Sequence, residues 1–207
     1  VFVDRLRVDE ARLARIAAGV SAVASLGDPV GEVYDATVLP NGLRAHKQRV
    51  PLGVLGVVYE SRPDVTAEVA SLAIRSGNAV LLRGGRESLG TNDAIASVVR
   101  AALESAGLPA DAVQYVDDPD RSRLLEMLQL RDCVDAIVPR GGEKLQAFCA
   151  EHSRVPVIYG GIGICHLYVE PSADLGAALG VVRNAKVQRP TVCNALDTLL
   201  VHRDAAA

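Results

Sequence analysis

Along most of this chain, short apolar segments alternate with segments in which apolar residues recur every three or four positions. The first type predicts buried strands and the second predicts amphipathic helices. The expected strands span residues 54–59, 79–82, 113–116, 134–138 and 155–159. The expected helices span residues 65–76, 88–106, 120–130 and 142–151. This order is typical of right-handed βαβ crossovers, so it predicts a mostly parallel sheet.

A different pattern precedes the alternating region. Apolar residues follow a helical period across residues 4–26. Two further apolar segments, 33–39 and 43–50, flank the turn signal Pro40-Asn41-Gly42 and predict a β-hairpin. We therefore expect an N-terminal helix and a hairpin before the sheet begins.

The pattern changes again after Gly163. A strand at 164–169, a helix at 173–186 and a strand at 195–201 indicate the start of another α/β domain. We expect an α/β fold of two domains, with the boundaries 1–163 and 164–207. Because the sequence starts at Val1 without a methionine and stops after one strand of the second domain, we expect a piece of a longer protein.

Composition and charge narrow the class of protein. Apolar residues make up 49% of the 207 residues, enough to bury a sizeable core. The net charge is −3 and no basic block is present, which argues against a nucleic-acid partner. No run of about eighteen uncharged apolar residues occurs, so we expect no membrane partner.

The cysteines indicate the compartment. The chain has four, and none forms a C-x-x-C pair. They are Cys133, Cys149, Cys165 and Cys193. This usage favours a reduced, cytoplasmic protein. Cys165 and His166 are adjacent, but neighbours on a strand point apart and no second ligand pair follows, so no metal site is expected.

Three of the expected strands end in loops that carry arginine, glycine or both. They are Glu60-Ser61-Arg62, Arg83-Gly84-Gly85-Arg86 and Arg140-Gly141-Gly142. Ligands bind outside the carboxyl ends of parallel strands, where glycines allow close approach and arginines attract phosphate. The usual dinucleotide fingerprint G-x-G-x-x-G does not follow a strand here. Each loop alone also fits a glycine turn with solvated arginines.

Cys193 lies in a polar loop between an expected helix and an expected strand. Lys186, Arg189 and the backbone N–H groups around Asn194 would favour the thiolate, which is the nucleophilic form. The competing interpretation is an inert, small apolar side chain.

Five segments together indicate a family. They are Pro51 to Pro63, Ser76 to Gly85, Pro139 to Gly142, Cys165 to Val169 and Asn184 to Ala195. In this order they resemble the gamma-glutamyl phosphate reductases, also called glutamate-5-semialdehyde dehydrogenases, of the aldehyde dehydrogenase superfamily. The resemblance implies an aldehyde-dehydrogenase-like Rossmann-type sheet, with an NADPH-binding domain at 1–163 and the start of a catalytic domain at 164–207.

The resemblance also implies roles for individual residues. Cys193 would be the catalytic thiol, and the backbone N–H of Asn194 would stabilise the oxyanion. Ser61 stands roughly where relatives carry an oxyanion-binding asparagine. Arg83, with Gly84, Gly85 and Arg86, stands where relatives bind the adenosine ribose of the cofactor. Arg140, Gly141 and Gly142 match the loop near the pyrophosphate.

The implied reaction is NADPH-dependent reduction of L-glutamyl 5-phosphate to L-glutamate 5-semialdehyde and phosphate, in proline biosynthesis. The hydrolytic relatives use a glutamate base after the fifth strand, but residues 160–163 here are Gly-Gly-Ile-Gly. The implied partners are the substrate, glutamate 5-kinase, and further copies of the full-length protein in a homo-oligomer.

Two alternatives stay open at this point. The first is a non-catalytic, truncated nucleotide-binding or oligomerisation module whose interface is the hairpin around Asn41. The second is an NAD-dependent aldehyde oxidation like that of the hydrolytic relatives, against which the missing glutamate argues.

Overall fold

The computed structural model describes residues 6–60, 62–160, 163–190 and 192–206. The chain divides into two compact units, and the boundary in the sequence lies between Tyr159 and Gly160. The functional boundary expected from the sequence, between 163 and 164, stays a prediction.

The first unit is built around a parallel sheet of four strands, ordered β5-β4-β3-β6. Its strands are β3 (Val54–Tyr59), β4 (Ala79–Arg83), β5 (Val113–Tyr115) and β6 (Ala136–Arg140). The central strand β3 pairs with β4 on one side and with β6 on the other. This confirms the parallel sheet expected from the alternating pattern.

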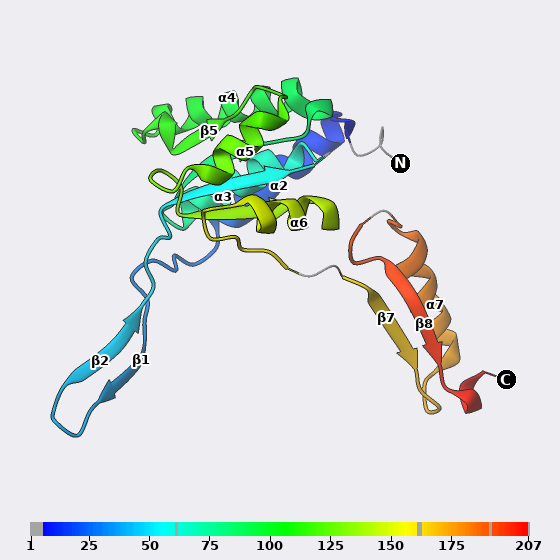
Figure 1. The fold of residues 1–207 in the computed structure, drawn as a ribbon. Helices are drawn as coiled ribbons and strands as arrows, with labels where there is room; N and C mark the ends of the chain where they lie inside the picture. Colours follow the sequence, from blue (N-terminus) through cyan, green and yellow to red (C-terminus); the bar gives the residue numbers. More distant parts are fainter. Residues whose placement is uncertain (1–5, 61, 161–162, 191, 207) are drawn as a thin grey trace. The chain divides into compact units, whose positions relative to one another are not determined.

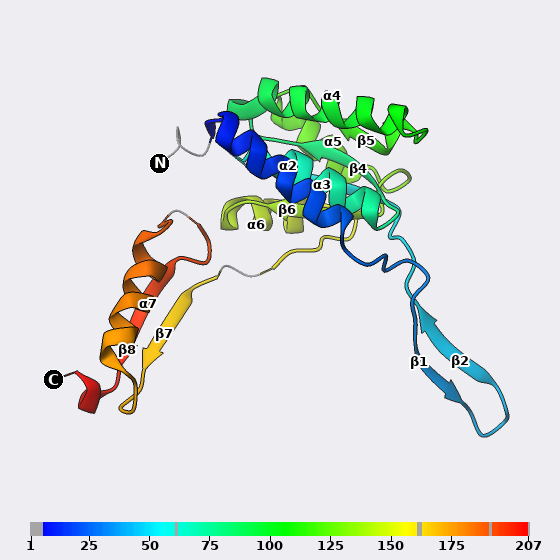
Figure 2. The same ribbon diagram turned by 180° about the vertical axis from the view of Figure 1, so that it is seen from behind.

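Helices cover both faces of the sheet. They are α3 (Asp64–Arg75), α4 (Leu89–Ser105), α5 (Arg121–Gln129) and α6 (Glu143–His152). Helices α3 and α4 contact each other, as do α5 and α6 (Figures 1 and 2). Two apolar clusters fill the layers: one joins Val57 and Leu82 to Val65 of α3, and the other joins Val58 to Met127 and Leu128 of α5. Burying each such side chain contributes about 1.5–3 kcal/mol to the free energy of unfolding.

The fifth expected strand, 155–159, is reduced to a single bridge between Ile137 and Val157. The N–H of Ile137 donates to Pro156 O, and the N–H of Ile158 donates to Ile137 O, each at 2.8 Å. To extend the pairing toward the start of β6, residue 156 would have to donate its N–H, and to extend it toward the end, residue 139 would have to do so. Both residues are prolines, and proline has no N–H. The two prolines therefore end the ladder on either side of one bridge.

The segments before the sheet are a helix and a hairpin. Helix α2 (Glu10–Ala24) starts later than the pattern from residue 4 predicts, because the Asp9 side chain accepts a hydrogen bond from Arg12 N at 2.9 Å and caps it there. Strands β1 (Val33–Val38) and β2 (Arg44–Gln48) form the expected antiparallel hairpin, and every residue of both strands is exposed.

The second unit contains one βαβ element. Its parts are β7 (Cys165–Val169), α7 (Leu175–Val187) and β8 (Leu196–Val201), with the two strands parallel. The Asp174 side chain caps α7 by accepting from Ala177 N at 3.1 Å. The loop after α7 carries Cys193 into β8, as the sequence predicted.

Within the described ranges, no helix is both long and apolar enough to cross a membrane.

Candidate functional site

The three strand ends whose loops carry arginine, glycine or both lie side by side. Val58 of β3 aligns with Arg83 of β4, and Tyr59 of β3 aligns with Arg140 of β6. The segments that follow β3, β4 and β6 therefore leave the sheet at the same edge. This is the edge at which open parallel sheets bind ligands.

Arg83 ends β4 with a half-buried guanidinium. Its Nη2 donates to Asp120 O at 2.9 Å, and its Nε is buried without a hydrogen-bond partner among the described residues. Burial lowers the pKa of Arg83, whereas Tyr115 and the nearby carboxylate of Asp118 oppose this shift. A buried donor without a partner costs about 1–3 kcal/mol. The guanidinium has five N–H donors, so the Nη donors beyond the one bound to Asp120 O are left for an anionic ligand, which fits a phosphorylated cofactor.

The two glycines after Arg83 have different surroundings. Gly84 is buried, and a Cβ atom placed on it would lie 2.0 Å from Asn92 Nδ2. The carbonyl of Gly85 accepts a hydrogen bond from Ser88 Oγ at 3.3 Å. Arg86 is exposed and opens the short 3₁₀ turn that leads into α4. The sequence suggested that these glycines approach a ligand, and the structure adds that Gly84 packs closely on α4.

The loop after β6 lies next to a carboxylate of the protein itself. The backbone N–H of Gly142, the residue that caps α6, donates to Glu60 Oε2 at 3.2 Å. A Cβ atom on Gly141 would lie 2.7 Å from the same oxygen. Arg140 is exposed at the end of the strand. Helix N-termini attract anions, and here the carboxylate of Glu60 takes that position.

Sequence reasoning did not single out Glu60 itself. The available signal was its place directly after β3, in the loop that also contains Ser61. Ser61 lies outside the described residues, so its assigned role stays a prediction.

Cys193 is exposed in the turn between α7 and β8, and Asn194 is exposed beside it. The carbonyl oxygen of Cys193 accepts a hydrogen bond from Cys165 Sγ at 3.4 Å. Lys186 donates from Nζ to Leu196 O at 2.8 Å, which ties the end of α7 to the first residue of β8. Its ammonium group is thereby engaged by a carbonyl.

The other cysteines differ from Cys193 in burial. Cys149 is fully buried, and burial raises its pKa to about 11, so it is a protonated packing residue at neutral pH. Cys133 is exposed and lies in the first unit. Within the part of the chain that the structure describes, no three His, Cys, Asp or Glu side chains gather as metal ligands would.

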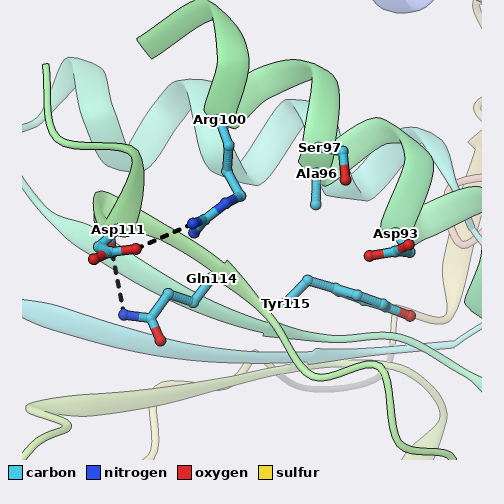
Figure 3. A pocket seen from close by; sticks show the side chains of 7 residues that line it. All are labelled: Asp93, Ala96, Ser97, Arg100, Asp111, Gln114 and Tyr115. Carbon is cyan, nitrogen blue, oxygen red and sulfur yellow. Dashed lines mark hydrogen bonds and ion pairs between the residues drawn. The ribbon is translucent and has the colours of Figure 1, made fainter. Parts of the chain in front are cut away.

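A cavity of about 360 Å³ lies between α4 and β5 at the sheet edge (Figure 3). Its cation, Arg100, donates to Asp111 Oδ1 at 3.1 Å, to Val113 O at 2.8 Å and to Ala110 O at 3.2 Å. Arg100 therefore braces α4 against the start of β5, which is a structural task.

Comparison with known proteins adds to this geometry. No family model matches the chain. Gamma-glutamyl phosphate reductase from Shewanella amazonensis is 57% identical over 203 residues, covering 98% of this chain and 48% of that protein. By sequence, the chain is a relative of the gamma-glutamyl phosphate reductases. It spans about half the length of the relatives that it matches.

Solved structures agree with this assignment. The crystal structure of gamma-glutamyl phosphate reductase from Thermotoga maritima is 46% identical, with a TM-score of 0.87 over 97% of this chain and 49% of that one. A probable aldehyde dehydrogenase from Listeria monocytogenes is only 19% identical but has a TM-score of 0.73, over 91% of this chain and 41% of that one. The aldehyde-dehydrogenase-like fold expected from the sequence is thus confirmed.

Proposed function

We propose that this chain carries the cofactor-binding edge and the nucleophile of an NADPH-dependent gamma-glutamyl phosphate reductase. The intact protein would convert L-glutamyl 5-phosphate to L-glutamate 5-semialdehyde and phosphate, a step of proline biosynthesis. The observation that carries this proposal is 57% identity to such a reductase across 98% of the chain. The exposed thiol and the clustered strand ends supply the groups that the reaction needs.

Cys193 is the proposed nucleophile. Its thiolate attacks the acyl carbon of the substrate, a carbon–sulfur bond forms, and the carbon–oxygen bond to phosphate breaks. Phosphate leaves with the bonding electron pair, and the acyl group stays on Cys193 as a thioester. An acyl phosphate is already activated, so this step needs little acid assistance.

NADPH, when bound, supplies the hydride that reduces the thioester. The resulting oxyanion lies beside the nucleophile, where the backbone N–H of Asn194 and the side chain of Ser61 would donate hydrogen bonds to it. Collapse of this species breaks the carbon–sulfur bond, releases the aldehyde and, with one proton, restores the thiol of Cys193.

The cofactor would lie along the C-terminal edge of the sheet. Arg83 and Arg86 would bind the 2′-phosphate of the adenosine ribose, with Gly84 and Gly85 between them. The Nη donors of Arg83 that are not bound to Asp120 O support this role. Arg140, Gly141 and Gly142 would lie at the diphosphate.

The absence of an acid in the Gly160 to Gly163 segment favours reduction over hydrolysis. An enzyme that passes its thioester to hydride gains nothing from a side chain that activates water. A reductase of this kind therefore differs from the relatives that oxidise aldehydes to acids.

The remaining parts of the proposal concern the intact protein. The exposed hairpin of β1 and β2 fits a contact between copies of the full-length chain, and the substrate and glutamate 5-kinase are the expected partners. The expected compartment is the cytoplasm.

The test is a trapping experiment on the intact protein. L-glutamyl 5-phosphate is added without NADPH, the protein is digested, and the mass of the peptide that contains Cys193 is measured. An acylated Cys193 peptide that disappears when NADPH is added, with semialdehyde formed in equal amount, supports the proposal. NADPH oxidation without acylation of Cys193 would overturn the thioester route.

A further inference from the structure

A hydrogen-bonded network of buried polar side chains lies beneath the candidate cofactor edge. Tyr59, Thr66, Ser88 and Asn92 are each at most 3% exposed. Tyr59 is the last residue of β3, Thr66 lies in α3, and Asn92 lies in α4. Four polar residues so deeply buried are costly unless they are bonded to one another.

The hydrogen bonds of this network have a fixed donor-to-acceptor direction. Thr66 Oγ1 donates to Asn92 Oδ1 at 3.3 Å, and it lies 2.6 Å from the Tyr59 hydroxyl. Since Thr66 gives its only proton to Asn92, Tyr59 donates to Thr66. Burial raises the pKa of Tyr59 well above its usual value, so Tyr59 keeps the proton that it donates.

Asn92 joins this network to the loop after β4. Its Nδ2 donates to Ser88 Oγ at 3.0 Å and to the Tyr115 hydroxyl at 3.4 Å, which uses both amide protons. Ser88 Oγ in turn donates to the carbonyl of Gly85 at 3.3 Å. The backbone of Gly84 lies so close to the Asn92 amide that no side chain fits between them.

We propose that Asn92 is a positioning residue for the loop from Arg83 to Arg86, and through it for binding of the adenosine end of NADPH. Asn92 does not touch the cofactor. Its amide fixes the backbone of Gly84 and, through Ser88, the carbonyl of Gly85. The two arginines that flank these glycines are then held at a set spacing. This inference rests on the proposed function, because it names what orients the residues assigned to the cofactor.

A purely structural role would be served as well by apolar residues. Filling a core with well-packed apolar side chains is often as stabilising as a buried polar network. Unlike apolar contacts, hydrogen bonds are directional, so each bond of the network fixes the orientation of one group relative to the next across β3, α3, α4 and the loop. Its end on the Gly85 carbonyl links it to the candidate site.

Asn78 provides a matched control at the opposite end of β4. It is also a buried asparagine, 7% exposed, and its amide also holds a loop: Oδ1 accepts from Gly53 N at 2.9 Å, and Nδ2 donates to Ser76 O at 3.1 Å. It precedes Ala79, the first residue of β4, whereas Gly84 follows the last. Both asparagines stabilise the fold, but only Asn92 lies under the candidate cofactor loop.

The experiment compares Asn92→Ala and Asn78→Ala in the intact protein. We measure the Kd of NADPH by titration, and we measure hydrogen exchange of the amides of residues 84–88 without cofactor. For Asn92→Ala we expect the Kd to rise about tenfold, the scale of one lost buried hydrogen bond, and exchange in the loop to accelerate. For Asn78→Ala we expect a lower melting temperature with both readouts near the wild-type values.

Ser88→Ala removes the hydroxyl that accepts from Asn92 and donates to Gly85, and it serves if Asn92→Ala does not fold; it should also raise the Kd and speed exchange. A Kd within about twofold of wild type for a folded Asn92 variant, or an equal rise for Asn78→Ala, would overturn the positioning role. If wild-type protein does not bind NADPH, the proposed function fails, and loop exchange alone decides whether Asn92 holds the loop.

Discussion

Glu60 and Gly142 are 82 residues apart in sequence, yet the carboxylate of Glu60 accepts a hydrogen bond from the backbone N–H of Gly142 at 3.2 Å. Glu60 follows β3 and Gly142 precedes α6, and the pairing of Tyr59 with Arg140 brings the two segments together. The carboxylate thus takes the position at the start of α6 that we propose for the diphosphate of the cofactor.

This contact leads to the first prediction. A diphosphate at the start of α6 meets repulsion from the charge of Glu60 and competes with it for the Gly142 N–H. Glu60→Gln keeps the shape and removes the charge, so the Kd of NADPH should fall by roughly two- to fivefold. Calorimetric titration at two salt concentrations measures this, and the gain should shrink as salt rises. A higher Kd in Glu60→Gln would mean that Glu60 itself helps to bind the cofactor.

The second prediction concerns the nucleophile. Cys193→Ala should abolish reduction of L-glutamyl 5-phosphate, because no other group replaces a covalent thioester. Cys133→Ala is the control, since it removes another exposed thiol from the other unit. Cys149→Ala and Cys165→Ala should also keep most activity. Oxidation of NADPH, followed by its absorbance, gives the rates, and turnover in Cys193→Ala would refute the assignment.

The third prediction concerns the reverse reaction. With semialdehyde and NADP⁺ but no phosphate or arsenate, steady oxidation should be slow, because no acid in the Gly160 to Gly163 segment activates water against the thioester. Inorganic phosphate should restore the rate, since it is the acyl acceptor in this direction. Rapid oxidation in a buffer free of both anions would reveal a water-activating base elsewhere in the protein.

The fourth prediction concerns the choice of cofactor. A hydrogen bond to a charged group contributes about 1.5–3 kcal/mol, so Arg83→Ala should weaken NADPH binding roughly 10- to 150-fold, with a much smaller effect on NADH. Arg131 is exposed, and Arg131→Ala is the control for a general loss of positive charge. Titration of both cofactors decides this, and equal losses would show that Arg83 contacts a part common to both.

The fifth prediction follows from the burial of Cys149. Burial raises its pKa to about 11, so the thiolate fraction falls tenfold for each pH unit below that value. At pH 8 iodoacetamide should label Cys193 and Cys133 and leave Cys149 unlabelled. Peptide mass spectrometry measures the labelling, and modification of Cys149 in folded protein would contradict its protected position.

Much of the fold follows from periodicity alone. Strands β3, β4 and β5 and helices α3 to α6 occur where the apolar pattern predicts them, because burial decides both the pattern and the structure. Strand β6 lies two residues further along the chain than the expected 134–138. The fifth strand differs because hydrogen bonding, not burial, ends it. Pro139 and Pro156 were visible in the sequence, but their effect depends on which N–H groups face the neighbouring strand.

The candidate site could be predicted only in part. Arg83 and Gly142 were recognisable because loops after parallel strands collect at one edge. The roles of Glu60 and Asn92 depend on contacts between segments far apart in sequence. An asparagine within a helical pattern reads as a surface residue, and only the packing of α4 on Gly84 shows that it is buried.

The prolines beside the Ile137–Val157 bridge also affect how firmly the last segment of this unit is held to the sheet. In a longer parallel ladder, an N–H group at position 139 would donate to Ile158 O, and an N–H group at position 156 would donate to Asp135 O. Pro139 and Pro156 lack these donors, so two backbone hydrogen bonds, both made by Ile137, join the segment to β6 among the described residues. A segment with so few backbone bonds separates from a sheet at a lower free-energy cost than a fully paired strand, so this part of the chain should open locally before β3 and β4 do.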